Sequence, residues 1–217
     1  MSAKKKAAPV AIGLRAERGG AVVVGVALEG SEPRVVLSYF LATAAEGDRL
    51  ALEPYHVAAE MARGAAAVTD EIRAAVAKGR KKQDALAAKG LKSIAGKLGK
   101  QGYEPATVAL LVNRAGWVKD LLAYSLAFAD HPPVAEGLAV RDALRFACGK
   151  AELDVAEMDE KSLPELASEV TRLGAAELDA RLKELGAEVS PPWRKEHKAA
   201  CLAAWLALAQ AAGKTAR

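Results

Sequence analysis

The sequence predicts an α/β protein with a mixed five-stranded sheet and helices on both faces of that sheet. Three strand-like segments follow one another near the start of the chain and are joined by short turns. The spacing of apolar residues then changes to the helical period of three to four. Two further strand-like segments each lie between helical segments. Strands in hairpin order, followed by strands that alternate with helices, are typical of a mixed sheet covered by helices.

The three opening strands are predicted from their residue types and from the turns between them. VAIGLRA (10–16) and AVVVGVALEG (21–30) are separated by ERGG, whose glycines suit a tight hairpin. RVVLSYFLATA (34–44) follows the turn sequence GSEP. Valine, isoleucine, tyrosine and phenylalanine are frequent in these segments, and these residue types favour strands.

A change of composition follows the helix that is predicted over residues 55–77, which has Pro54 in its first turn. Segment 78–102 has one acid, Asp84, and five glycines that each lower helix stability by up to ~1 kcal/mol. We therefore expect a frayed helix or a helical hairpin that stands off the core as a basic excursion. The cations of this segment are Lys78, Arg80, Lys81, Lys82, Lys89, Lys92, Lys97 and Lys100.

The second half of the chain is predicted to alternate again between strands and helices. A buried central strand is expected at 106–116 and an edge strand at 151–160. Helices are expected at 117–129, 134–149, 162–174, 175–186 and 193–212. We expect a single domain over 10–212, with a disordered basic tail at 1–9 and a second tail at 213–217.

Composition bounds the partners and the location of the protein. The chain has 217 residues, a net charge of +4 and a pI of about 9.0. Its two cysteines, Cys148 and Cys201, lie in apolar helix-like runs and are expected to be reduced and buried. No signal peptide is evident, and the apolar run CLAAWLALAQAA is too short to cross a membrane. We therefore expect a soluble cytoplasmic protein with no membrane partner and no cofactor.

The order of elements and the second half of the chain together resemble a known family. The informative stretches are PPVAEGLAVRDALRFACGKAELDVAEMDEKSLPELASEVTRLG and HKAACLAAWLALA. The element order is that of the ribonuclease-H-like fold, and these stretches resemble its Holliday-junction resolvase (RuvC-like) branch. The similarity covers about residues 10–45 and 105–212 and lies in element order and in the pattern of small residues. Resolvases of this family are two-fold dimers, so the resemblance also implies a homodimer.

Catalysis in that family depends on a cluster of acids that holds two divalent metal ions. The acid that closes the first strand corresponds to Arg15, and the glutamate that closes the fourth strand corresponds to Asn113. The two acids of the last helix correspond to Lys198 and Cys201, and an alignment shifted by one residue replaces Lys198 with His197. None of these residues is a carboxylate, and Mg²⁺ prefers anionic oxygens. The resemblance therefore predicts that this site holds no metal.

These substitutions lead to the hypothesis of a catalytically inactive, resolvase-like domain that binds nucleic acid, DNA in preference, or a nucleoprotein partner. Arg15 would anchor a phosphate, with Lys198 near it and Asn113 as a hydrogen-bond donor. The basic segment would add phosphate contacts, which make affinity fall steeply with salt. Its predicted contact residues are Arg80, Lys81, Lys82, Lys89 and Lys92.

Two functions of other classes compete with this hypothesis. One is a metal-dependent, structure-specific nuclease whose acids have moved, for which Glu60, Glu136 and Asp142 are the candidates. The other is a structural or adaptor protein that does not bind nucleic acid. In that case the Ala- and Leu-rich helices form a protein interface, and the basic segment serves only solubility.

Overall fold

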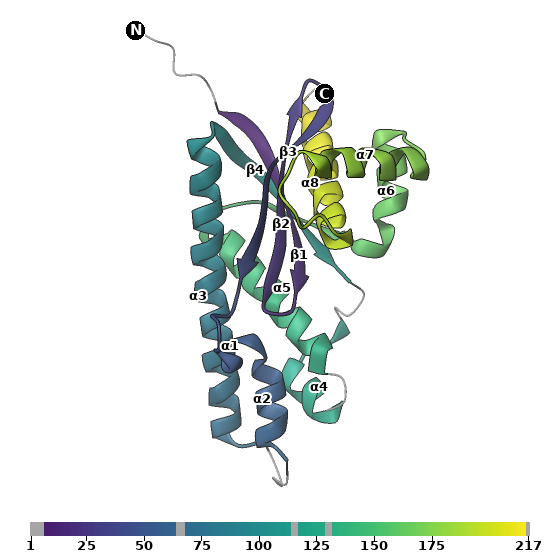
Figure 1. Cartoon of the computed structure of the whole chain (residues 1–217). Coiled ribbons are helices and arrows are strands. Elements are labelled where there is room, and N and C mark those ends of the chain that lie inside the picture. Colours follow the sequence, from purple (N-terminus) through teal and green to yellow (C-terminus); the bar gives the residue numbers. More distant parts are fainter. Residues whose placement is uncertain (1–6, 64–67, 114–116, 129–131, 216–217) are drawn as a thin grey trace.

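The structure, a computed structural model, describes residues 7–63, 68–113, 117–128 and 132–215. Its centre is a five-stranded sheet with the strand order β3-β2-β1-β4-β5 (Figure 1). The first three strands are antiparallel neighbours, whereas β4 runs parallel to β1 and β5 runs parallel to β4. The predicted mixed sheet is therefore confirmed. The strands are β1 (Ala8–Glu17), β2 (Gly20–Glu29), β3 (Glu32–Ala42), β4 (Tyr103–Val112) and β5 (Val155–Asp159).

Helices cover both faces of this sheet, as predicted. On one face α8 packs on β1, β2 and β4, and α6 and α7 lie against α8. On the other face α3 and α5 pack together, and α1, α2 and α4 gather at one end of this pair (Figure 1). The helices are α1 (Arg49–Leu52), α2 (Pro54–Met61), α3 (Asp70–Lys100), α4 (Leu121–Ala127), α5 (Pro132–Lys150), the 3₁₀ helix η2 (Glu160–Ser162), α6 (Leu163–Thr171), α7 (Ala175–Ala187) and α8 (Lys195–Thr215).

β1 divides its side chains between two hydrophobic cores, because successive residues of a strand point to opposite faces. Ile12 and Leu14 are fully buried in the core under α3 and α5. Gly13 lies on the opposite face, where a Cβ would overlap the backbone carbonyl oxygen of Ala200 on α8. This glycine lets α8 lie directly on the sheet. Arg15 continues the same face at the carboxyl end of β1.

The expectation that segment 78–102 is frayed and stands off the core is wrong. Residues 78–100 belong to α3, a single helix of 31 residues whose inner face is buried against the rest of the protein. Two of its glycines serve close packing: a Cβ at Gly79 would overlap the carbonyl oxygen of Leu50, and one at Gly90 would lie 2.9 Å from Cγ of Leu41. The inner face consists of Ile72, Val76, Gly79, Gln83, Ala87, Leu91, Ile94 and Leu98.

Both ends of α3 carry residues that stabilise a helix. The Thr69 side chain accepts a hydrogen bond from the Ile72 backbone N–H at 3.3 Å and so caps the first turn. Asp70 and Glu71 lie in that first turn, where negative charge opposes the positive end of the helix dipole. Lysines occupy the last turn. These local signals explain why one helix continues through a glycine-containing sequence.

Several boundaries differ from the predictions. The predicted helix 55–77 is divided between α2 and the start of α3, and residues 64–67 lie outside the described part. The predicted strand 106–116 is β4, which ends at Val112, and the predicted helix 117–129 shortens to α4. The predicted tails are shorter, since Ala8 and Pro9 belong to β1 and α8 continues to Thr215; residues 1–6 and 216–217 lie outside the described part.

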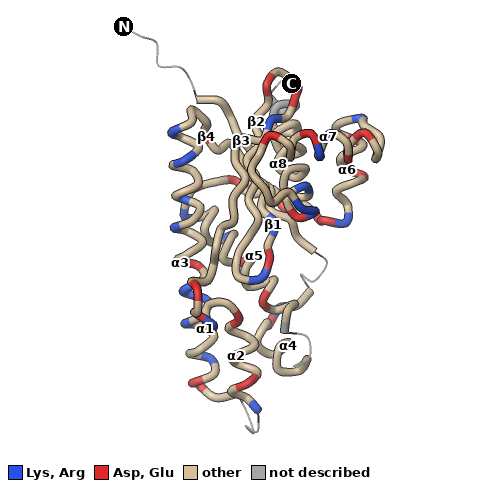
Figure 2. Tube along the Cα trace, viewed as in Figure 1, with Lys and Arg blue, Asp and Glu red and all other residues tan. Residues whose placement is uncertain are grey.

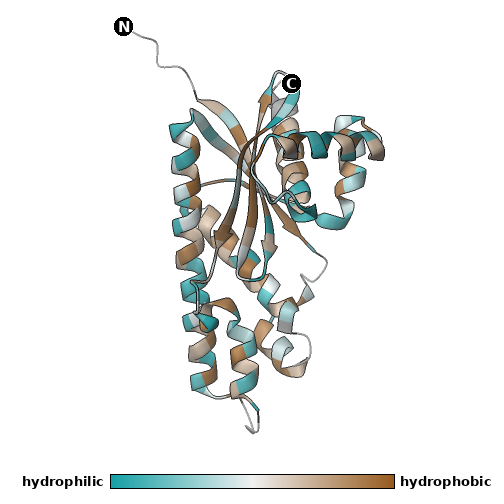
Figure 3. Cartoon of the chain, viewed as in Figure 1, coloured by the Kyte–Doolittle hydropathy of each residue, from teal (hydrophilic) through white to brown (hydrophobic). Residues whose placement is uncertain are grey.

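The strands are mainly hydrophobic, whereas hydrophilic residues recur along α3 (Figure 3). Cys148 and Cys201 are free and buried, as predicted. Among the described helices, none combines the length and the apolar character that crossing a membrane requires.

Candidate functional site at the carboxyl ends of the parallel strands

The parallel strands β1, β4 and β5 bring their carboxyl ends to one edge of the sheet, and the first turn of α8 reaches the same edge. In open α/β sheets, ligands bind outside the carboxyl ends of the strands. Arg15 on β1 and Asn113, which directly follows β4, both belong to this edge. The topology therefore places two of the four positions that were matched to catalytic acids, Arg15 and Asn113, at the carboxyl ends of β1 and β4.

Arg15 is surrounded by three carboxylates from three different elements. Its Nε donates to Glu160 Oε1 of η2 at 2.9 Å, and its Nη1 donates to Glu17 Oε1 of β1 at 3.2 Å. Glu196, in the first turn of α8, places a carboxylate oxygen 4.0 Å from the same Nη1. The Arg15 side chain is only 22% exposed. A guanidinium therefore lies among the acids at this edge of the sheet.

This arrangement bears on the phosphate-anchoring role predicted for Arg15. A phosphate that approached Arg15 would meet Glu160 and Glu196, whose negative charges repel it. Carboxylates also engage guanidinium donors that a bidentate phosphate contact would need. The geometry favours Arg15 as the cation that holds these acids together, and a contact between Arg15 and nucleic acid stays a prediction.

His197, rather than Lys198, lies on the side of α8 that faces β1. The His197 ring is buried and packs against Trp193, with 5.9 Å between ring centroids. Burial lowers the pKa of His197, and the negative charge of the nearby Glu17 carboxylate only partly offsets this shift. The imidazole is therefore mainly neutral at pH 7. Lys198 instead donates to Asp179 Oδ1 of α7 at 2.7 Å, and this hydrogen bond lowers the pKa of Asp179.

A second arginine beside this edge was not predicted. Arg141 of α5 is buried and donates from Nε to the carbonyl oxygen of Leu111 on β4 at 3.3 Å. Burial lowers the pKa of Arg141, and the negative charge of Glu160 opposes that shift. The surrounding sequence, VRDALRF, gives no signal of this role because a helical arginine is usually exposed.

Three aromatic rings, two of them exposed, lie between β4 and the end of α4. Trp117 is 68% exposed and stands edge-on to Tyr124, with 5.9 Å between ring centroids. Tyr124 in turn lies 5.0 Å from the ring of Phe128, which is also exposed. We refer to these three residues as the α4 aromatic cluster. Asn113, which is exposed, precedes them in the chain.

The residues at the matched positions do not fit a divalent metal. Arg15 is a cation, Lys198 is paired with Asp179, and burial raises the pKa of the Cys201 thiol to about 12. A metal needs a deprotonated thiolate or an anionic oxygen at such positions. Within the described residues, no group of three or more histidine, cysteine, aspartate and glutamate side chains is placed to hold an ion.

The alternative acids of a relocated nuclease site have separate partners. Glu60 accepts from Nη2 of Arg49 at 2.7 Å on the exposed side of α2. Asp142 accepts from Arg80 at 3.3 Å and from Arg145 at 2.8 Å. The described contacts therefore do not support the nuclease alternative.

Glu136, the third of these acids, is a buried carboxylate at the junction of α2 and α5. Its Oε1 accepts hydrogen bonds from the backbone N–H groups of Tyr55 and His56, at 2.8 and 2.9 Å, in the first turn of α2. Its Oε2 is buried without a hydrogen-bond partner among the described residues. Burial raises the pKa of Glu136 to about 7. The group therefore changes charge near neutral pH.

The outer face of α3 carries a row of exposed lysines, which we call the α3 lysine stripe: Lys78, Lys81, Lys89, Lys92 and Lys100. Figure 2 shows cationic residues recurring along this helix. An α-helix turns by about 100° per residue, so these positions fall within one sector of roughly 100°. At about 1.5 Å per residue the row is about 33 Å long. None of its members forms an ion pair within the described part of the chain.

The other two predicted contact residues of α3 are already paired. Lys82 Nζ donates to Asp48 Oδ2 at 2.6 Å, which lowers the pKa of Asp48. Arg80 donates to the Tyr55 hydroxyl and to Asp142, both at 3.3 Å. Arg80 and Lys82 thus differ from Lys81, Lys89 and Lys92, which keep unpaired charge.

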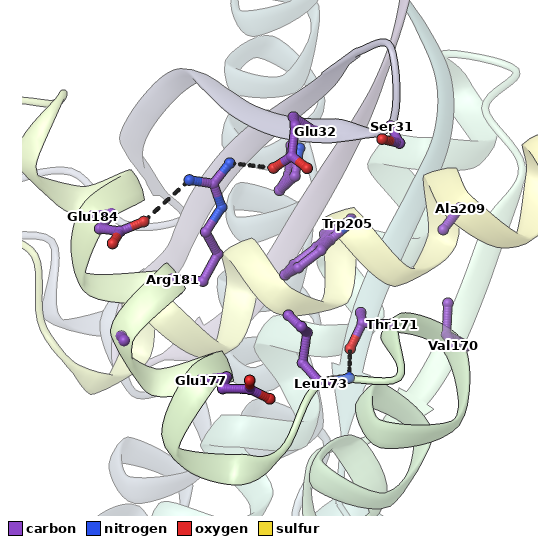
Figure 4. A pocket seen from close by; sticks show the side chains of 12 residues that line it. Ser31, Glu32, Val170, Thr171, Leu173, Glu177, Arg181, Glu184, Trp205 and Ala209 are labelled. Atoms are coloured by element: carbon purple, nitrogen blue, oxygen red, sulfur yellow. Dashed lines mark hydrogen bonds and ion pairs between the residues drawn. The ribbon is translucent and has the colours of Figure 1, made fainter.

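A pocket of about 680 Å³ lies on the opposite side of the sheet, between the β2–β3 turn, α6, α7 and α8 (Figure 4). Trp205 and Leu173 form part of its apolar wall. Arg181 lies at its rim and is paired with both Glu32 and Glu184. Because the one arginine is neutralised by carboxylates, this pocket does not suit a phosphate.

Comparisons with known proteins identify the fold. No protein-family model matches the chain, and no curated protein matches it. The chain is similar to Thermus thermophilus RuvC, with a TM-score of 0.55 and 12% sequence identity over 95% of this chain and 97% of that chain. T. thermophilus RuvC in complex with Holliday junction substrate gives a TM-score of 0.52 and 14% identity over 95% and 96%. The chain therefore has the ribonuclease-H-like fold of RuvC, as its sequence predicted.

Proposed function

We propose that this chain is a catalytically inactive, RuvC-like domain that binds nucleic acid, DNA in preference, through the α3 lysine stripe. The unpaired charge of the stripe is the observation that carries the proposal. Its length of about 33 Å is close to one turn of B-DNA, about 34–36 Å. Lysines that contact phosphates release condensed counterions, which provides affinity without sequence recognition.

Two further observations support this reading. Arg15 lies among carboxylates at the edge where related catalysis would need metal ions, so we propose binding without cleavage. A protein of the same fold is seen in complex with a Holliday junction substrate, which supports DNA as the nucleic acid. A homodimer is part of the proposal by analogy with that fold. A cytoplasmic location is proposed because the sequence shows no evident signal peptide.

Removing two lysines of the stripe is expected to weaken DNA binding and its dependence on salt. Each phosphate contact contributes about −0.9 to the slope of log K against log salt concentration. The variant Lys78→Ala/Lys81→Ala is therefore expected to reduce the magnitude of that slope by about 1.8. Fluorescence anisotropy with a labelled DNA duplex over a series of salt concentrations measures it.

The matched control is Arg34→Ala/Lys183→Ala, which removes two exposed cations that lie away from α3. This control is expected to leave the slope unchanged. The stripe proposal fails if Lys78→Ala/Lys81→Ala has the wild-type slope, or if the control loses as much as the stripe variant.

The adaptor alternative is favoured by one observation, the α4 aromatic cluster. Exposed aromatic residues are enriched in the centres of protein interfaces, and Trp117 is 68% exposed. An adaptor predicts a salt-insensitive oligomer that Trp117→Ala dissociates, in a protein that binds no nucleic acid. Light scattering of wild type and Trp117→Ala at low and high salt tests this alternative.

A further inference from the structure

A groove of about 640 Å³ lies between α3 and α5, on the helical layer that carries the lysine stripe. Four alanines contribute to its lining, and these small side chains leave the groove open to a flat molecule. Lys89 and Lys92 line it from α3, and Phe146 and Lys150 line it from the last turns of α5. Two stripe lysines therefore belong both to the stripe and to the groove.

Phe146 gives this groove an apolar contact surface. Its side chain is 42% exposed, whereas its neighbour Ala147 is buried in the core. The Lys150 ammonium lies 5.6 Å from the centre of the Phe146 ring. The ring therefore combines accessible apolar area with a cation over one of its faces, a combination that suits a planar anionic ligand.

The charge of the groove has one sign. Lys89, Lys92 and Lys150 form no ion pair within the described residues, and no carboxylate lines the groove. The acidic pocket beside Arg181 on the opposite layer shows the contrary pattern. An occupant of the α3–α5 groove must therefore carry negative charge next to an apolar surface.

We propose that this groove binds an unpaired nucleotide of a nucleic-acid strand, with the base stacked on Phe146 and the adjoining phosphates on Lys89, Lys92 and Lys150. This inference rests on the proposed function and adds a preference for unpaired strands. A nucleic-acid strand offers both features the groove demands, a planar base and regularly spaced phosphates. Its backbone would continue along the α3 lysine stripe, which an isolated anion would not use.

The test compares a labelled oligothymidylate with a DNA duplex of the same length. Stacking of one base changes affinity by roughly tenfold, so Phe146→Ala is expected to bind the single strand about tenfold more weakly. Its affinity for the duplex is expected to stay within about twofold of wild type, since paired bases cannot reach the ring. Phe146→Tyr keeps the aromatic face and is expected to bind the single strand as wild type does.

The matched control is Phe40→Ala, which removes a comparably exposed phenylalanine, 48% exposed, from β3. This control is expected to leave both affinities unchanged. The unfolding temperatures of all variants establish that each is folded. We expect all of them to fold, because both phenylalanine rings are partly exposed.

The possible failures are distinguishable. If Phe146→Ala binds the single strand as wild type does, or loses affinity for single strand and duplex equally, the groove assignment is overturned while the stripe proposal stands. If polyglutamate competes as well as the oligothymidylate, the groove recognises charge alone and base stacking is overturned. If the wild-type protein binds neither DNA at low salt, both the groove and the proposed function fail.

Discussion

Raising the pH from about 5 to about 8 is expected to destabilise the protein through Glu136. The contribution of this carboxyl to the free energy of unfolding is expected to fall by about 3 kcal/mol. Burial raises the pKa of this carboxyl from 4.5 to about 7 in the folded protein. Between these two values the folded state binds the proton that the unfolded state releases, so stability falls as the pH rises. A difference of one pKa unit corresponds to about 1.4 kcal/mol, which gives the expected size.

Denaturant unfolding of wild type and Glu136→Gln across this range measures the effect. Glutamine keeps an oxygen that can accept from the Tyr55 and His56 N–H groups but carries no charge. The variant is expected to match wild type near pH 5 and to be more stable by up to about 3 kcal/mol near pH 8. The lowered pKa of His197 acts in the opposite direction below about pH 6.5, but it is common to both proteins.

The control for Glu136 is Glu60→Gln on the exposed side of α2. The hydrogen bond from Arg49 lowers the pKa of Glu60, so its contribution is lost only as the pH falls below about 4.5. No difference from wild type is therefore expected to develop between pH 5 and 8. Parallel stability curves for wild type and Glu136→Gln in that range would show that the buried carboxyl does not titrate there.

The second large effect is expected from Arg15→Ala, which removes the cation among Glu17, Glu160 and Glu196. The partly buried acids then repel one another without compensation, and we expect a loss of about 2 kcal/mol. For a domain of this size the loss corresponds to a fall in Tm of about 4–8 °C. Sodium chloride is expected to restore part of the Tm of Arg15→Ala, because screening weakens the repulsion among the three acids.

The control is Arg34→Ala, which removes an exposed arginine paired with a single acid, Glu29. Its Tm is expected to fall much less than that of Arg15→Ala and to respond little to sodium chloride, because exposed ion pairs contribute little to stability. If Arg15→Ala unfolds at the wild-type temperature, the guanidinium does not hold the three acids together.

The sheet was predictable because its signals are local. The β-branched and aromatic residues of the opening segments, with glycines in the turn, indicate a hairpin before any tertiary contact is considered. The continuity of helix α3 could not be predicted from composition, because glycines lower the stability of a helix. Its buried positions, from Ile72 to Leu98, recur at three and four, and Gly79 and Gly90 stand where neighbours come close. A glycine therefore marks close packing as well as helix disruption.

The candidate site could be predicted only in part. The sequence identified Arg15 and the missing acids, and the fold places Arg15 at the expected edge of the sheet. It could not identify Glu160 and Glu196 as partners of Arg15, because that contact depends on the convergence of β1, η2 and α8. Arg141 was missed for the same reason, since its burial follows from the packing of α5 on β4. Partners that are distant in sequence leave no periodic signal.

The most direct test of binding without metal-dependent cleavage uses the wild-type protein and a labelled four-way DNA junction. Anisotropy at low and moderate salt, with and without Mg²⁺, is followed by a denaturing gel of the same samples. We expect salt-sensitive binding with the DNA intact in both conditions. Cleavage that appears only with Mg²⁺, and that persists in Arg15→Ala, would contradict the assignment of an inactive site, and the absence of any binding would contradict the nucleic-acid function itself.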